Sequence, residues 1–201
     1  VAASAGDAGG AIGAAYVVHH ENNDRIVAKS HMDHAYLGPS FSTEDIAELL
    51  DENSENLPID QFEILKTQTL EELTSKTAMA ISEGKVIGWF QGRMEWGPRA
   101  LGNRSILGDP RRADMKEILN IKIKRRESFR PFAPSILRES VSDWFEEEDE
   151  VPFMMKVFPV ILRKRKSIPA VTHCDGSGRL QTVYEATNPK YHALISQFYS
   201  V

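Results

Sequence analysis

The stretch of residues 91–112 constrains the fold of this chain more than any other. It reads QGRMEWGPRALGNRSILGDPRR and holds four glycines, two prolines and five arginines. Glycine and proline at this density interrupt both helices and strands. We therefore expect a long ordered loop that contains one short strand at 104–107. Apolar side chains within the stretch argue against disorder, and long ordered loops inside compact domains usually carry function.

The arginines and small donors of this loop are suited to an anion. Arginine binds phosphate or carboxylate through two parallel N–H groups, and glycine lets backbone N–H groups approach the same anion. Asn103, Arg104 and Ser105 add further donors side by side. The residue types fit an anion-binding loop and a set of internal ion pairs equally well, so both interpretations stay open.

Signals for helices and strands surround the loop. Ser42 followed by Asp45 marks the start of a short amphipathic helix, and residues 69–82 carry apolar side chains at helical spacing before Gly84. The other expected elements are a strand at 85–90, a helix at 115–126 capped by Asp114, strands at 169–173 and 179–185 joined by an Asp-Gly turn, and a helix at 191–199. This mixture predicts an α/β fold.

A second group of cations follows the loop. Its members are Lys122, Lys124, Arg125, Arg126 and Arg130. Positions 122, 126 and 130 share a face if the helix continues, but Pro131 ends a helix near this point. Such cations form a polyphosphate site if they line a cleft, and a solvated helix face if they do not. Considered alone, the segment favours the solvated face.

A third candidate is the loop at 172–176, with Arg179 close behind it. Loops between strands are common positions for binding residues, and histidine titrates near neutral pH. A hydrogen-bonding role inside the fold is the simpler interpretation of His173.

The overall charge and the cysteine content exclude several classes of protein. A net charge of -5 over 201 residues argues against a general nucleic-acid binder. A single cysteine allows no internal disulfide framework and no cysteine-rich metal site, which fits a reducing compartment. The sequence has no run of about 18 apolar residues. We therefore expect no membrane-spanning helix, no membrane partner and a cytoplasmic location.

Three segments of the chain resemble a known family. GWFQGRMEWGPRALGNRSILGDPR, LNIKIKRRESFRPFAPSIL and IPAVTHCDGSGRLQTV are similar to the signatures of the NodU/CmcH-type O-carbamoyltransferases, a group that includes nodulation proteins. The opening GDAGGAIGAA resembles the closing part of the family's actin-like catalytic domain. The resemblance extends from about Gly6 to the end of the chain.

The resemblance implies an architecture. It predicts an α/β fold with a YrdC-like twisted mixed sheet and flanking helices, preceded by an N-terminal remnant of an actin-like (ASKHA) domain. Residues 1–40 would end the actin-like domain, and residues 41–84 would form a helical connection. Residues 85–201 would form the YrdC-like carbamoyl-adenylate domain, truncated at its C-terminus.

The resemblance also implies an activity in two steps. The YrdC-like domain binds ATP, with Mg²⁺, and carbamoyl phosphate to make a carbamoyl-adenylate. The actin-like domain, with bound Fe²⁺, then transfers the carbamoyl group to a hydroxyl of an acceptor. The resemblance assigns catalytic roles to Lys124, Arg126 and Arg130. It assigns the binding of the nucleotide and carbamoyl phosphate to Arg99, Asn103, Arg104, Ser105, His173 and Arg179. It assigns metal binding to Asp7.

Two departures from the family pattern affect these expectations. The chain has no His-x-x-x-His pair for the metal, and the family's TG-x-P-x-LLNTSFN segment should follow Phe198 but does not. We therefore expect a fragment that cannot transfer carbamoyl groups to an acceptor alone. Its partners would be small-molecule substrates and the remainder of the full-length enzyme, and the sequence is compatible with a homodimer.

Two alternative functions stay open at this stage. One is an enzyme like tRNA threonylcarbamoyl-adenylate synthase, a related family that also has a YrdC-like fold. The other is a non-catalytic RNA-binding module that uses the basic stretch at 111–130, although the acidic overall charge argues against it.

Overall fold

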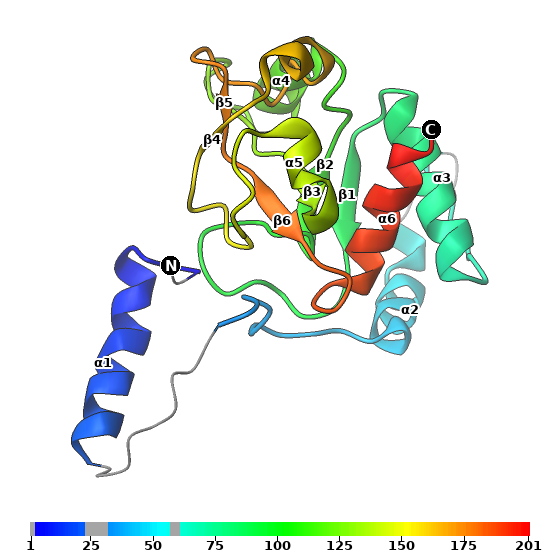
Figure 1. Cartoon of the computed structure of the whole chain (residues 1–201). Helices are drawn as coiled ribbons and strands as arrows, with labels where there is room; N and C mark the ends of the chain where they lie inside the picture. Colours follow the sequence, from blue (N-terminus) through cyan, green and yellow to red (C-terminus); the bar gives the residue numbers. More distant parts are fainter. Residues whose placement is uncertain (1–2, 23–31, 57–60) are drawn as a thin grey trace.

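The computed structural model describes residues 3–22, 32–56 and 61–201. Helices and strands are mixed along the chain, which confirms the α/β class (Figure 1). The α-helices are α1 (Asp7–Glu21), α2 (Thr43–Glu52), α3 (Leu70–Ser82), α4 (Met115–Glu117), α5 (Val141–Trp144) and α6 (Pro189–Tyr199). The strands are β1 (Ile87–Phe90), β2 (Arg104–Leu107), β3 (Ser135–Leu137), β4 (Phe158–Pro159), β5 (Ser177–Gly178) and β6 (Gln181–Val183). A π-helix (Ile118–Ile123) and short 3₁₀ helices (Ser54–Asn56, Arg138–Ser140, Leu162–Ser167) complete the described elements.

The described strands form three two-stranded sheets rather than the single mixed sheet that we expected. The pair β1–β2 is antiparallel, with Trp89 opposite Ser105, and the pair β3–β6 is parallel, with Ile136 opposite Thr182. The pair β4–β5 is antiparallel. The strands stay short because prolines and glycines interrupt the extended backbone between them.

The local signals for the starts of α2 and α3 are confirmed. The Ser42 hydroxyl accepts the Asp45 N–H at 3.0 Å, and the Asp45 carboxylate accepts the Ser42 N–H at 2.7 Å, which completes a capping box at α2. The Thr69 hydroxyl accepts the Glu72 N–H at 3.1 Å at the start of α3. Gly84, with a φ of +86°, follows the end of α3, a conformation that glycine adopts without strain.

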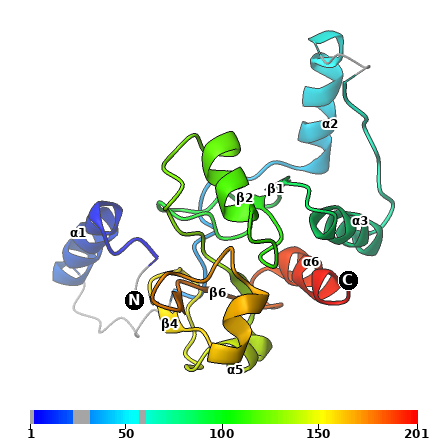
Figure 2. The ribbon, with the colours of Figure 1, turned by 90° about the horizontal axis from the view of Figure 1, so that it is seen from above.

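Helices α3 and α6 lie side by side next to β1 (Figures 1 and 2). Their shared core cluster consists of Ala78, Trp89, Val183, Tyr191 and Leu194. Helix α6 begins at Pro189, two residues before the expected start, because the Asn188 side chain accepts the Tyr191 N–H at 3.2 Å. A second cluster packs α5 against β4 and the turns near β5, and includes Val141, Phe145, Phe158, Val160 and Leu180.

The helix expected at 115–126 differs in form and in length. Helix α4 covers only Met115–Glu117 and continues as the π-helix, which ends at Ile123. The Asp114 carboxylate does not cap it, because it accepts hydrogen bonds from the Arg112 guanidinium at 3.0 and 2.7 Å. Ile123 is 45% exposed, so the apolar face expected at this end of the helix is not packed.

The strand expected at 169–173 is wrong. The chain makes turns there, and the Ile168 carbonyl accepts the N–H groups of Val171 at 3.3 Å and Thr172 at 3.2 Å. These local bonds replace strand pairing. The Asp-Gly turn that follows is confirmed by Gly176, whose φ is +83°.

Helix α1 stands apart from the rest of the chain in both views (Figures 1 and 2), and most of its described side chains are exposed. The division at residues 40 and 84, and the assignment of residues 1–40 to an actin-like domain, stay predictions. The described helices include none that is both long and apolar enough to span a bilayer.

Candidate functional site

A buried carboxylate orders the loop at 91–103. Glu95 is 6% exposed, and its Oε1 accepts the backbone N–H groups of Leu101 at 2.6 Å, Asn103 at 2.9 Å and Arg104 at 3.2 Å. Such a charge-assisted arrangement fixes the backbone on the C-terminal side of Arg99. The loop is therefore a rigid support for the arginine at its tip.

Close packing of the loop against α6 requires a glycine. Gly102 has a φ of +104°, and a Cβ at this position would lie 2.3 Å from the ring of Tyr191. The Tyr191 hydroxyl donates to Ser135 Oγ at 2.8 Å, and burial raises the pKa of Tyr191 to about 12. The phenol stays neutral and ties α6 to β3.

Two of the candidate donors in the loop are used inside it. The Asn103 side chain donates to the Arg93 carbonyl at 2.7 Å and accepts from Asn188 at 2.8 Å. The Arg104 guanidinium donates to the carbonyl oxygens of Gln91 at 2.6 Å, Asn103 at 2.8 Å and Gly92 at 3.1 Å. Neither residue lines the cleft described next.

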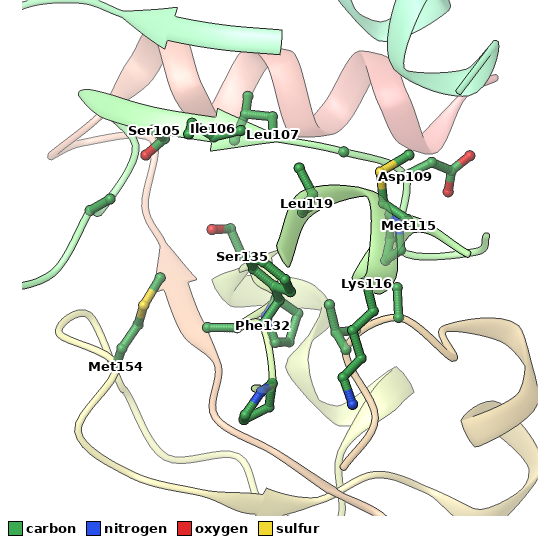
Figure 3. A pocket seen from close by; sticks show the side chains of 18 of the residues that line it. Ser105, Ile106, Leu107, Asp109, Met115, Lys116, Leu119, Phe132, Ser135 and Met154 are labelled. Carbon is green, nitrogen blue, oxygen red and sulfur yellow. The ribbon is translucent and has the colours of Figure 1, made fainter. Parts of the chain in front are cut away.

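A cleft of about 340 Å³ opens between β2, α4, α6 and the segment at 131–135 (Figure 3). Figure 3 shows Ser105 and Leu107 of β2 on one side, with Phe132 and Lys116 across from them. The apolar part of the wall includes Met115, Leu119, Phe132, Leu194 and Phe198. Ser105 and Ser135 add hydroxyl groups to the lining of the cleft.

Besides Lys116 of α4, four cations from three segments of the chain line this cleft: Arg99, Lys124, Arg126 and Arg179. Burial and then the charge of Arg126 hold the pKa of Lys124 below its ordinary value. Burial lowers the pKa of Arg179, and the nearby charges of Arg99 and Arg126 lower it further. The cleft is therefore a region of mutual repulsion among cations, which an anion would relieve.

Nothing in the described part of the chain neutralises these four cations by an ion pair. The only carboxylate among the described residues that line the cleft is Asp109, which pairs with Arg111 at 2.9 Å. The Nε of Arg99 is buried and has no hydrogen-bond partner among the described atoms. A buried donor without a partner indicates a place for an acceptor from outside the chain.

The remaining candidates lie outside the lining of the cleft. Arg130 pairs with Glu127 at 2.8 Å on the exposed surface. His173 contacts Ser177 through Nδ1 at 3.2 Å inside the turn, and burial is the main cause that lowers its pKa, against the opposing charge of Asp175. Asp7 is the first residue of α1, but its side chain lies outside the described part of the structure.

Sequence reasoning missed three residues that shape the site: Glu95, Asn120 and Phe132. The Phe132 ring lies beneath two of the cations, 4.8 Å from Arg126 Cζ and 5.9 Å from Lys124 Nζ, within the range of cation–π attraction. Asn120 was detectable as an amide among apolar residues in ILNIKI. An acidic residue between the arginines of the loop, as Glu95 is, was a comparable signal.

A rigid arginine loop, an apolar wall and four unpaired cations have the composition of a site for a phosphorylated small molecule. The chain belongs to the carbamoyltransferase C-terminus family, whose model matches residues 78–201. This match confirms the family resemblance found in the sequence.

Individual relatives agree with this assignment. The chain is 44% identical over 199 residues to the nodulation protein NolO of Bradyrhizobium diazoefficiens, covering 97% of this chain and 35% of that protein. It is 45% identical over 119 residues to the 3'-hydroxymethylcephem-O-carbamoyltransferase of Amycolatopsis lactamdurans, covering 59% and 22% respectively. An uncharacterised Synechocystis protein is 44% identical over 218 residues, with 97% of this chain and 34% of that protein covered. The chain thus spans about a third of the length of the first two full-chain matches.

Proposed function

We propose that this chain forms the ATP-binding part of an O-carbamoyltransferase, where ATP and carbamoyl phosphate yield a carbamoyl-adenylate on a YrdC-like domain. The proposal rests on one observation above all: Arg99, Lys124, Arg126 and Arg179 converge unpaired on one cleft in a member of the carbamoyltransferase C-terminus family. The name of the Amycolatopsis relative supports a carbamoyl group and a hydroxyl acceptor.

The apolar residues of the cleft fit the base of a nucleotide, and its cations fit the phosphates. A volume of about 340 Å³ is within the range of small-molecule pockets. Met115 and Leu119 offer an apolar surface to a base, and the cations offer charge to the phosphates. Lys124 and Arg126 would contact the phosphates from the side of Phe132, and Arg99 would meet them from the arginine loop.

The proposed chemistry creates and moves negative charge at this place. For atoms to balance, water first cleaves carbamoyl phosphate to carbamate and phosphate. A carbamate oxygen then attacks the α-phosphorus of ATP, the bond to the leaving oxygen breaks, and pyrophosphate departs. Fixed cations lower the barrier because they stabilise the charge that develops on the phosphate oxygens without reorganising.

The chain's own residues bear differently on the two implied metals. Mg²⁺ is usually held by substrate phosphates with one or two carboxylates, and the cleft could admit it on the phosphates of ATP. The described residues contain no group of three or more His, Cys, Asp or Glu side chains that could hold a metal. The residues described here therefore do not fit an iron site. Fe²⁺ and transfer to the acceptor hydroxyl are proposed for the actin-like part of the enzyme.

Family membership favours this function over the two alternatives. The match to a carbamoyltransferase family supports carbamoyl transfer rather than threonylcarbamoyl-adenylate synthesis. An RNA-binding surface needs cations spread along an accessible face, whereas Lys124 and Arg126 are gathered with Arg179 around a single cleft.

The direct test is a calorimetric titration of ATP with Mg²⁺ into the chain. We expect binding by the parent and its loss in a Lys124→Ala, Arg126→Ala double variant. The matched control is an Arg163→Ala, Lys166→Ala variant, which removes two exposed cations outside the cleft. Equal binding by all three proteins, or loss in the control alone, would refute the assignment of the cleft to ATP.

An assay of pyrophosphate release tests the second substrate. Carbamoyl phosphate added to the ATP-bound chain should release pyrophosphate, which a coupled enzymatic assay detects, and the double variant should release none. Pyrophosphate release that is unchanged in the double variant would show that the reaction occurs elsewhere.

A further inference from the structure

One fully buried amide lies directly behind the cleft. Asn120 belongs to the π-helix Ile118–Ile123 and is 0% exposed. Its Nδ2 donates to the carbonyl oxygens of Ser128 at 3.1 Å and Arg130 at 2.9 Å, and its Oδ1 accepts from Arg126 Nε at 2.7 Å. Because a guanidinium only donates and a carbonyl only accepts, this is the one orientation of the amide that satisfies all three partners.

The backbone carbonyl groups of Leu119 and Asn120 fix where the chain leaves the helix. The Leu119 carbonyl accepts the Lys124 N–H at 2.9 Å, and the Asn120 carbonyl accepts the Arg126 N–H at 3.0 Å. Between these two bonds Arg125 has a φ of +47°. Widened helical turns and left-handed non-glycine residues cost free energy and gather at functional sites. Both unusual features here lie in the segment that brings Lys124 and Arg126 to the cleft.

The guanidinium of Arg126 is held on one edge and one face. Asn120 holds the Nε edge, and the Phe132 ring lies 4.8 Å from Cζ. Within the described part of the chain, the terminal N–H groups of Arg126 donate no hydrogen bond, while Arg126 lines the cleft. The arrangement leaves the end of the guanidinium that suits two phosphate oxygens free for a ligand.

We propose that Asn120 is a positioning residue that orients the Arg126 guanidinium for a phosphate group in the cleft. It acts through Arg126 and makes no contact with the ligand. The ligand's identity as ATP rests on the proposed function, but the hydrogen bond from Arg126 to Asn120 and its effect on the guanidinium do not.

The first experiment needs no ligand. The Nε–H proton of Arg126 should exchange slowly with water in nitrogen-edited NMR spectra of the whole chain, and its signal is assigned by its absence in Arg126→Lys. We expect this signal to broaden or vanish in Asn120→Ala and to persist in Asn120→Asp, which keeps an acceptor oxygen. A rapidly exchanging Nε–H in the parent, or an unchanged signal in Asn120→Ala, would overturn the proposal.

The second experiment is a double-mutant cycle on ATP affinity measured by calorimetry. Asn120→Ala should weaken ATP binding about tenfold, as expected for one misplaced charge-assisted contact, and should change nothing further in an Arg126→Ala background. Arg126→Lys keeps the cation but loses both Nε–H and the terminal N–H groups, so it should lose at least as much affinity as Asn120→Ala. Equal losses from Asn120→Ala in both backgrounds would show that it does not act through Arg126.

A matched variant separates positioning from general destabilisation. Thr74 is another fully buried polar residue, 1% exposed, whose hydroxyl donates to the Leu70 carbonyl in α3. Thr74→Ala should lower the denaturation midpoint and leave ATP affinity unchanged. If Asn120→Ala does not fold, Arg126→Lys decides alone: parental affinity in that variant overturns the proposal. If the parent binds no ATP, the proposed function fails, and the NMR experiment still decides the role of Asn120.

Discussion

At the scale of single residues, one carboxylate organises the arginine loop. Oε1 of Glu95 accepts three backbone N–H groups of a loop whose own residues are mostly basic and small. A charged acceptor in this position satisfies several backbone N–H groups at once. In helices and sheets, backbone carbonyl groups accept those hydrogen bonds instead. The loop therefore depends on Glu95 for three of its backbone N–H groups, as it depends on Arg104 for three of its carbonyl groups.

Replacing Glu95 should destabilise the whole chain. Glu95→Ala leaves three backbone N–H groups without an acceptor, and we expect a loss of about 3 kcal/mol in the free energy of unfolding. Glu95→Gln keeps one acceptor oxygen and should lose about half as much. Urea denaturation measures both, with the exposed Glu148→Ala as a control. A Glu95→Ala variant as stable as that control would refute the role of Glu95.

His173 should make stability depend on pH in the mildly acidic range. Burial is the main cause that lowers its pKa in the folded chain below the value near 6.5 of an unfolded chain. The unfolded state therefore binds the proton more readily, and this contribution to stability is complete above about pH 6.5 and falls as the pH drops. In urea titrations from about pH 7.5 to 5, His173→Gln should lose less stability than the parent. A parallel decline in the two proteins would contradict the prediction.

At the scale of elements, the sequence predicted the structure that depends on local hydrogen bonds, but not the structure that depends on tertiary contacts. The starts of α2 and α3 were predictable because Ser42, Asp45 and Thr69 make hydrogen bonds within one turn of themselves. The π-helix Ile118–Ile123 was not predictable, because the buried contacts of Asn120 with residues 128 and 130 come from a later turn of the chain. A helical period alone cannot reveal a widened turn.

Helix α2 offers a test of purely local stability. It has a complete capping box, and none of its residues is buried in the described part of the chain, so we expect its unfolding to be only weakly coupled to the core. Ser42→Ala should cost about 1 kcal/mol of helix stability and speed hydrogen exchange of the amides of Thr43–Glu52. The urea midpoint of the whole chain should not move. A lowered midpoint would mean that α2 contributes to the cooperative core.

At the scale of the whole molecule, the cleft gathers cations that the sequence alone could not sort. Arg99 and Arg179 lie 80 positions apart in the chain, yet both line the cleft, while Arg104 is turned onto backbone carbonyls and Arg130 onto Glu127. Residue type and spacing predicted a basic, anion-seeking chain. Which cation faces the cleft depends on how the loop and the π-helix exit are folded, and that is set by the contacts of buried side chains such as Glu95 and Asn120, which residue type and spacing do not reveal.

Clustered cations without counter-charges should make stability sensitive to phosphate. Inorganic phosphate that occupies the cleft stabilises the folded state by mass action. At about ten times its dissociation constant we expect a rise of roughly 3 °C in the thermal midpoint over sodium chloride of equal ionic strength. An Arg99→Ala, Arg179→Ala variant should lose this excess, and Arg163→Ala, Lys166→Ala should keep it. The same excess in all three proteins would assign the effect to general salt action.

The pairing of α3 with α6 has a consequence for how the chain is made. Residues of α3 leave the ribosome long before α6, and their buried partners Tyr191 and Leu194 belong to the later helix. Until α6 is synthesised, the apolar face around Ala78 and Trp89 has no cover, and the wall of the cleft that contains Leu194 does not exist. Assembly of this part of the molecule therefore waits until α6 has been synthesised, and the apolar face of α3 stays exposed during that interval.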